Sequence, residues 1–217
     1  MGYSLHDQET ARRLAATFMD IGAISLNTKE PFTWASGWKS PIYCDNRLTL
    51  SYPEVRSYVK NELTSVLQTH FPEVEVIAGV ATAGIPQGVL VAENMNLPFI
   101  YVRSKQKDHG LQNLIEGRIE PGKRAVVIED LVSTGTSSLN AVKALREAGF
   151  VVLGMAAIFT YGFKAADDQF EALETPLVCL SSYAALLDEA LKKNYIAAEQ
   201  LELLKAWRVD PVNWKGK

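Results

Sequence analysis

Two adjacent acids and the hydroxyl-rich loop after them are the residues of this chain best suited to chemistry. Glu129 and Asp130 directly follow a β-branched run, and the loop Ser133–Ser137 contains two serines, two threonines and a glycine. Backbone N–H groups at a helix N-terminus, helped by hydroxyl donors, bind phosphate. Carboxylates repel phosphate, so the acids suit sugar hydroxyls or a hydrated Mg²⁺. The plainer alternative is that the acids only end a strand and that Ser137 caps the next helix.

The flanking segments predict the strand and the helix that position these groups. Residues 126–128 are Val-Val-Ile, which is typical of a strand buried on both faces. After the loop, Leu139, Val142 and Leu145 recur at helical spacing, and Gly149 is placed to stop that helix. Ligands of open α/β sheets bind beyond the carboxyl ends of the strands, so the acids and the loop are expected at such an edge.

Alternating strand and helix patterns along the chain predict an α/β fold, with a mostly parallel sheet flanked by helices. The length of 217 residues and the 47% hydrophobic content suit a single domain over residues 1–217. Ser4 and Ser51 are each expected to cap a helix. Strands are expected near residues 75–80, 98–103, 124–128, 150–160 and 177–180.

The segment 30–47 is unusual for a structural loop, because it combines aromatic and basic residues around a Ser-Gly turn. It contains Trp34, Trp38, Lys39 and Arg47. Aromatic surface beside a cation suits a flat, anionic ring. The alternative is a small β-hairpin hood whose aromatic side chains fill its own core, and the residues alone favour neither.

Positive charge is concentrated in one short stretch of a chain whose net charge is −3. Arg103, Lys105, Lys107 and His109 fall within seven positions. Such a local reversal of sign suits a polyphosphate ligand. A solvated, charged loop is the alternative.

Four motifs, in order, carry a resemblance to a known family. Residues 124–138 resemble the fingerprint for phosphoribosyl diphosphate (PRPP) of the type I phosphoribosyltransferases, with a hydrophobic strand, two acids and a Thr-Gly-Thr-Ser loop. The pattern Phe-Thr-x-x-Ser-Gly-x-x-Ser-Pro at residues 32–41 is similar to the N-terminal signature of the bacterial orotate phosphoribosyltransferase family. Arg-x-x-x-Lys-Asp-His-Gly at residues 103–110 resembles its mobile catalytic loop. Residues 81–86 resemble the pyrophosphate loop, which places a non-proline cis peptide near Ala81–Thr82.

The resemblance implies a type I phosphoribosyltransferase fold with a hood formed by residues from about 20 to 48. It implies transfer of ribose 5-phosphate from PRPP to N1 of orotate, with Mg²⁺ bound mainly through PRPP and no metal ligands of the chain's own. The implied catalytic residues are Lys107, Asp108, His109 and Asp130, and Ser133 is implied to touch orotate. The residues implied to bind PRPP are Arg103, Lys107, His109, Glu129, Asp130, Leu131, Val132, Ser133, Thr134, Gly135, Thr136 and Ser137.

The family also implies a homodimer in which the loop Arg103–Gly117 reaches the adjacent subunit's site. The chain departs from the family pattern at Ala35, Ala83 and Ser104, where some members carry a basic residue. We hypothesise that Lys39 and Lys105 replace part of that lost charge.

Composition argues against several other classes of protein. The net charge of −3 argues against general nucleic-acid binding, and no apolar run approaches the ~20 residues that span a bilayer. The N-terminus lacks the form of a signal peptide, and Cys44 and Cys179 are too far apart to pair as metal ligands. These features favour a cytoplasmic protein. Two rivals remain, a purine phosphoribosyltransferase, expected to lack the 32–41 signature, and a PRPP-sensing regulator, expected to carry a nucleic-acid-binding extension or basic face.

Overall fold

The computed structural model describes residues 2–34, 36–104 and 114–214. Within these residues, a seven-stranded sheet has the order β1-β11-β10-β9-β6-β7-β8. Neighbouring strands are parallel except for β7 and β8, which are antiparallel. The prediction of a mostly parallel sheet is therefore confirmed. The strands are β1 (Ser4–Leu5), β6 (Val76–Val80), β7 (Phe99–Val102), β8 (Ile115–Glu116), β9 (Arg124–Val132), β10 (Val151–Thr160) and β11 (Leu177–Ser182).

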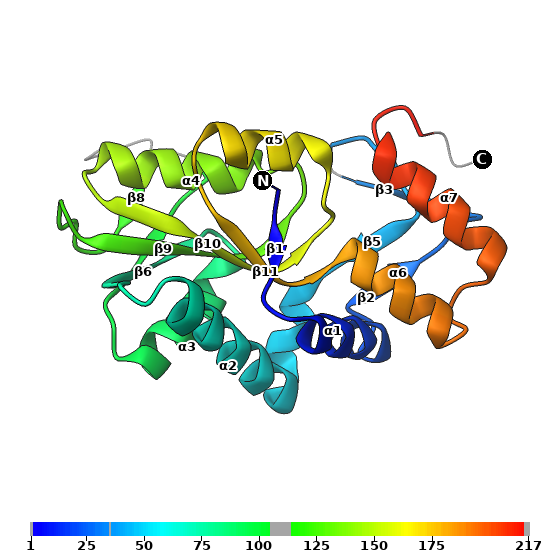
Figure 1. Ribbon diagram of the computed structural model, residues 1–217, viewed down its shortest axis with the longest axis horizontal. Helices are drawn as coiled ribbons and strands as arrows, with labels where there is room; N and C mark the ends of the chain where they lie inside the picture. Colours follow the sequence, from blue (N-terminus) through cyan, green and yellow to red (C-terminus); the bar gives the residue numbers. More distant parts are fainter. Residues whose placement is uncertain (1, 35, 105–113, 215–217) are drawn as a thin grey trace.

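Helices cover both faces of the sheet, with α4 and α5 on one face and α1, α2 and α3 on the other (Figure 1). The helices are α1 (Gln8–Asp20), α2 (Pro53–His70), α3 (Gly84–Met95), α4 (Thr136–Glu147), α5 (Lys164–Ala172), α6 (Tyr183–Lys192) and α7 (Ala198–Val209). No helix among the described residues is both long enough and apolar enough to cross a membrane.

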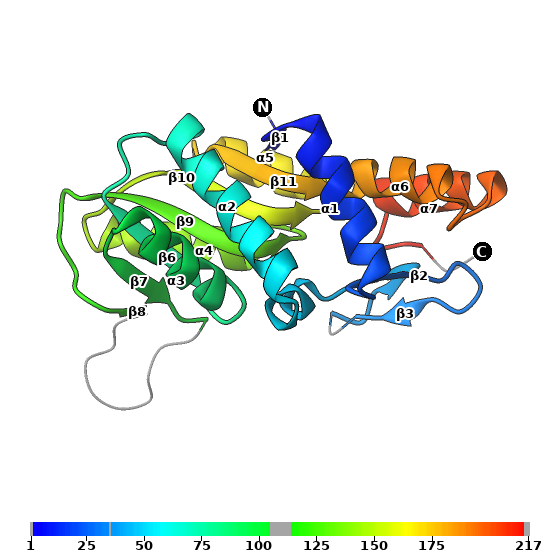
Figure 2. The ribbon, with the colours of Figure 1, turned by 90° about the horizontal axis from the view of Figure 1, so that it is seen from below.

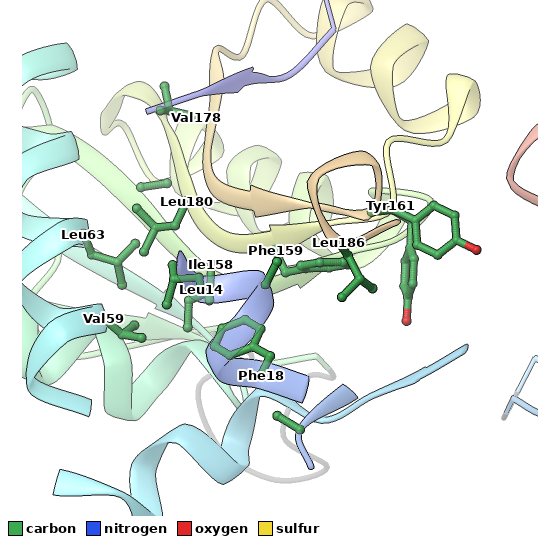
Figure 3. Close-up of a cluster of buried hydrophobic side chains, with 14 of the residues drawn as sticks. Leu14, Phe18, Val59, Leu63, Ile158, Phe159, Tyr161, Val178, Leu180 and Leu186 are labelled. Carbon is green, nitrogen blue, oxygen red and sulfur yellow. The ribbon is translucent and has the colours of Figure 1, made fainter. Parts of the chain in front are cut away.

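The strand β9 is buried on both faces because its side chains alternate between two hydrophobic cores. Val126 and Ile128 belong to the core under α1 and α2, whereas Ala125 and Val127 belong to the core under α4. Figure 3 shows the first core, in which side chains of α1, α2, β10 and β11 meet: Leu14, Phe18, Val59, Leu63, Ile158 and Leu180.

The hood consists of two small antiparallel pairs, β2 (Ile24–Leu26) with β5 (Ile42–Cys44) and β3 (Phe32–Thr33) with β4 (Lys39–Ser40). It lies beside α6 and α7 at one end of the molecule (Figure 1). A 3₁₀ helix, η1 (Asn46–Ser51), leads from it into α2. Trp207 of α7 holds the hood, because its indole N–H donates to the Lys39 carbonyl at 3.2 Å and its ring packs on Trp34.

Two predicted helix caps are wrong. Ser4 lies in β1 at the edge of the sheet, and α1 begins later, at the residue after Asp7, whose carboxylate accepts from the Thr10 N–H at 2.8 Å. Ser51 ends η1, and α2 has no side-chain cap. Pro53 sets the start of α2, because its ring suits the first helical position and keeps the residue before it extended.

Candidate active site

The predicted phosphate loop joins the carboxyl end of β9 to the start of α4. Gly135 is the N-cap of α4, with a φ of 82°, and no side chain caps this helix. Ser137 lies inside the helix, so the alternative in which it caps α4 is wrong. A Cβ atom at Gly135 would lie 3.0 Å from the Phe170 ring, so both conformation and space require glycine here. The helix N-terminus is thereby left open to an anion.

The side chains of the loop Ser133–Ser137 differ in how far they are exposed to solvent. Ser133 and Thr134 are half-buried, and Thr136 and Ser137 are exposed. Gln169 of α5 donates to the Thr134 carbonyl at 3.0 Å and so fixes the middle of the loop. Val132 is different, because it is the last residue of β9 and its side chain is buried. Any contact of Val132 with a ligand must use its backbone.

Glu129 points into the protein, and its residue is only 5% exposed. Its Oε2 accepts a hydrogen bond from the Ser138 hydroxyl at 2.9 Å, and its Oε1 accepts from the Asp130 N–H at 3.1 Å. Burial, followed by the charge of Asp130, raises its pKa well above the usual value. In this arrangement Glu129 braces the first turn of α4, and its direct contact with ribose stays a prediction from the resemblance.

Asp130 is half-buried and faces a different environment. Burial raises its pKa, whereas the charge of Arg47 in the hood lowers it. The Asn46 side chain, buried in η1, donates to the Asp130 carbonyl at 2.7 Å and ties the hood to this strand. No local pattern marks Asn46, because its role depends on a contact across 84 positions. Asp130 is therefore the acid of the pair that lies nearer to the hood.

A cavity of about 250 Å³ lies between the hood and the phosphate loop. Its lining residues are Thr33, Trp34, Tyr43, Cys44, Leu131, Ser133 and Tyr161. Trp34 packs on Trp207 of α7, outside the hood, and also lines the cavity, so its contact with a flat ring stays a prediction. Burial raises the pKa of the Cys44 thiol, which stays neutral at physiological pH. Tyr43, Cys44 and Tyr161 were not predicted as site residues, because they converge on Ser133 only through folding.

A second cavity, of about 330 Å³, connects the phosphate loop with the base of the basic loop. Ala81, Arg103, Ser104, Ser137 and Lys143 are among its lining residues. The Ala81–Thr82 peptide bond is cis, as the resemblance implies. A guanidinium nitrogen of Arg103, Nη1, is buried, forms no hydrogen bond with a described residue and lies 3.6 Å from the Glu116 carboxylate. The structure therefore brings Arg103 and Ser137 to one cavity.

The other residues of the predicted catalytic loop lie outside the described residues. These are Lys105, Lys107, Asp108 and His109.

The fold and the loop at the end of β9 place the chain among the phosphoribosyltransferases. Residues 51–188 match the model of the phosphoribosyl transferase domain family. An orotate phosphoribosyltransferase from Cytophaga hutchinsonii is 55% identical over 204 residues, which cover 94% of this chain and 98% of the relative. The chain belongs to the orotate phosphoribosyltransferase family.

Solved structures agree with this placement. The structure of Leishmania donovani UMP synthase is similar at a TM-score of 0.77 and 28% identity, over 93% of this chain. This chain spans only 42% of that longer protein. An orotate phosphoribosyltransferase from Aeropyrum pernix is similar at a TM-score of 0.74 and 27% identity, over 85% of this chain and 99% of that one.

Proposed function

We propose that this protein transfers the ribose 5-phosphate unit of PRPP to N1 of orotate, which yields orotidine 5′-monophosphate and diphosphate for pyrimidine synthesis. The observation that carries the proposal is the cavity of about 250 Å³ that is lined by Ser133 of the phosphate loop, by hood residues, and by Leu131 and Tyr161 of the sheet ends. A sugar phosphate seated on the loop would hold its reacting carbon beside a base in this cavity.

The 5′-phosphate anchors the substrate at the loop Ser133–Ser137. The uncapped start of α4 offers backbone N–H groups and a favourable dipole, and the loop hydroxyls add donors. Leu131 and Val132 contribute through the strand end that leads into the loop. Because this binding is remote from the bond that breaks, it positions the anomeric carbon for reaction.

Asp130 is the carboxylate assigned to the ribose. Breaking the anomeric C–O bond builds positive charge on the sugar, and a partly desolvated carboxylate nearby stabilises that charge. Its half-buried position at the carboxyl end of β9, three residues before Ser133, suits this role. Glu129 helps to position Asp130, because its Oε1 accepts a hydrogen bond from the Asp130 N–H. Among the described residues no activated nucleophile adjoins these groups, and we propose no covalent intermediate.

The leaving diphosphate is assigned to Arg103, Lys107 and His109, with Asp108 beside them. Mg²⁺ would neutralise part of the charge on this leaving group. The donor set fits an ion held mainly by PRPP, because both oxygens of Glu129 already accept a hydrogen bond within the protein, which leaves Asp130 as the acid of the pair to assist. The buried Arg103 Nη1 forms no hydrogen bond with a described residue and pairs with Glu116 only at 3.6 Å, which supports its assignment as a donor to an anion.

Orotate fits the cavity under the hood as a flat ring between aromatic walls, with the Ser133 hydroxyl at its edge. Its carboxylate needs a cation or donors. Lys39 is placed to serve, because its ammonium group donates to the Thr33 hydroxyl at 2.8 Å and Thr33 lines the cavity. This contact supports the hypothesis that Lys39 replaces the basic residue missing at position 35.

The test follows loss of orotate absorbance with PRPP and Mg²⁺, and release of diphosphate in the same reactions. We expect diphosphate only when orotate is present, and no reaction with hypoxanthine or adenine. Turnover of a purine base would overturn the assignment of the base, and binding of PRPP with no turnover of any base would favour a sensing role.

We also propose a homodimer in which the loop Arg103–Gly117 completes the adjacent subunit's site. Lys107→Ala and Asp130→Asn are each expected to be inactive alone. In a mixture of the two variants that is allowed to exchange subunits, each mixed dimer would contain one intact site, so about a quarter of wild-type activity should return. If the mixture stays inactive while mixed dimers form, the loop serves its own subunit.

We propose a single domain over residues 1–217 and a location in the cytoplasm. Both cysteines are free, with Cys179 buried and Cys44 half-buried, which suits a reducing compartment.

A further inference from the structure

Two histidines that are 64 positions apart in the chain meet away from the proposed active site. His6 follows β1, and His70 is the last residue of α2. His6 Nδ1 lies 3.3 Å from His70 Nε2, and the two rings meet edge to face. In Figure 2 the N-terminus and this end of α2 lie on the same side of the molecule. His70 precedes the start of β6, so the pair lies at the edge of the sheet opposite the phosphate loop.

Two carboxylates lie beside His6, in a group of possible ligands that does not include His70. Asp7 and Glu62 each offer an oxygen within 4.8 Å of a His6 ring nitrogen and of one another. Thr10 orients both acids, because its N–H donates to Asp7 Oδ1 at 2.8 Å and its hydroxyl donates to Glu62 Oε2 at 3.0 Å. Each carboxylate keeps a second oxygen that can act as a ligand.

The geometry of the histidine pair matches that of two ligands of one metal ion. Tetrahedral Zn²⁺ with Zn–N distances of about 2.0–2.1 Å places two ligating nitrogens roughly 3.3 Å apart. The other ring nitrogen of His6, Nε2, lies 3.1 Å from the Ser65 hydroxyl. A metal-binding histidine characteristically donates its second N–H to such a partner, which fixes the tautomer and the ring.

The type of ligand atom indicates which metal ion the cluster would hold. Imidazole nitrogens select Zn²⁺, Cu²⁺, Ni²⁺ or Co²⁺ over Mg²⁺. The cluster is therefore chemically distinct from the magnesium chemistry of the proposed reaction.

We propose that His6 and His70, with the carboxylates of Asp7 and Glu62, form a binding site for a divalent transition-metal ion such as Zn²⁺. The ion would join the N-terminal strand and the start of α1 to the end of α2. It would stabilise the folded protein, because the two histidines are held together only in the native state. Sequence reading found no such site, because no short spacing relates residues 6, 7, 62 and 70.

The experiment titrates untagged protein with Zn²⁺, and in parallel with Mg²⁺, and measures thermal unfolding and calorimetric binding. We expect Zn²⁺ alone to raise Tm, with one ion bound per chain at this site. Co²⁺ should give the visible absorption of a tetrahedral complex. His6→Gln and His70→Gln should each weaken Zn²⁺ binding by about tenfold or more.

His109→Gln is the matched control, because it removes the third histidine of the chain and should leave Zn²⁺ affinity unchanged. Activity with PRPP, Mg²⁺ and orotate should be unchanged in His70→Gln, so this test is independent of the proposed function. The proposal is overturned if Zn²⁺ does not raise Tm, or if its affinity is the same in both pair variants as in the wild type. In that event the two rings only share a hydrogen bond.

Discussion

The two ends of β9 carry charge in opposite ways. At its amino end, Arg124 binds Glu75 at 3.0 Å and Glu73 at 3.1 Å, and Lys123 binds the other oxygen of Glu75 at 2.8 Å. These opposite charges meet in solvent, and hydrogen bonds from Lys123 and Arg124 lower the pKa of Glu75 to about 2. At its carboxyl end, two like charges adjoin one another and are withdrawn from water, and the pKa values of Glu129 and Asp130 are raised.

This contrast supports the proposal that the amino end of β9 stabilises the fold and that its carboxyl end serves a ligand. At the amino end, each charge is already paired with an opposite charge of the protein itself. Burial of two neighbouring acids disfavours their charged forms, and perturbed pKa values of this kind are characteristic of functional sites. A ligand with hydroxyl donors and a bound cation would stabilise the charged forms of the acids at the carboxyl end. The comparison therefore predicts that changes at the two ends affect different properties.

Asp130→Asn should cause the largest effect, a loss in kcat on the order of 100-fold, because it removes a charge that stabilises the sugar in the transition state. Thermal stability should stay the same or rise, since a partly buried charge is removed. Steady-state rates from orotate absorbance and a thermal melt check both parts. Asp168→Asn, which removes an exposed charge paired with Lys164, is the control and should keep full activity. A kcat within twofold of wild type for Asp130→Asn would end the assignment.

For β9 and the segments after it, the sequence predicted the elements correctly but not the length of the strand. The β-branched run and the glycine loop predicted the strand, the phosphate loop and α4, because local propensity and backbone conformation decide them. The strand was expected to end at residue 128, but it continues to Val132. Continued alternation puts Glu129 on the α4 side with Ala125 and Val127, which is why its carboxylate meets Ser138 and not solvent.

The lining of the hood cavity was beyond sequence reading for a different reason. Tyr43 and Cys44 come from β5, Tyr161 follows β10, and Ser133 follows β9. These segments are joined by tertiary packing around Trp34 and Trp207, which no local pattern encodes. The motif at residues 32–41 located the hood but not the residues that it faces.

Glu129→Gln should have an intermediate effect that depends on pH. The raised pKa means that the unfolded chain ionises first as pH rises above about 4.5, so Glu129 destabilises the wild type progressively from that pH upward. Glutamine keeps the shape without the charge, so the variant should melt a few degrees higher at pH 8, because 1 kcal/mol corresponds to about 2–4 °C in a domain of this size.

Melting curves of wild type and Glu129→Gln at pH 5 and pH 8 measure this difference. The gap in Tm should widen with pH. A gap of the same size at both values would mean that Glu129 is not held protonated by its surroundings. Ser138→Ala, which removes the hydroxyl donor to Oε2, should shift Tm the other way.

Glu75→Gln should have the smallest effect, a modest loss of stability with full activity. The lowered pKa of Glu75 means that its contribution is present above about pH 4.5 and is lost as pH falls toward 2. The ion pairs are exposed, so the loss should also shrink at high salt. Melting curves at low and high salt check this. Glu73→Gln is the matched control, because it removes one contact of Arg124 and should cost less. If Glu75→Gln instead lowered kcat, the two ends of β9 would be energetically coupled, and the division between a stabilising end and a ligand-binding end would fail.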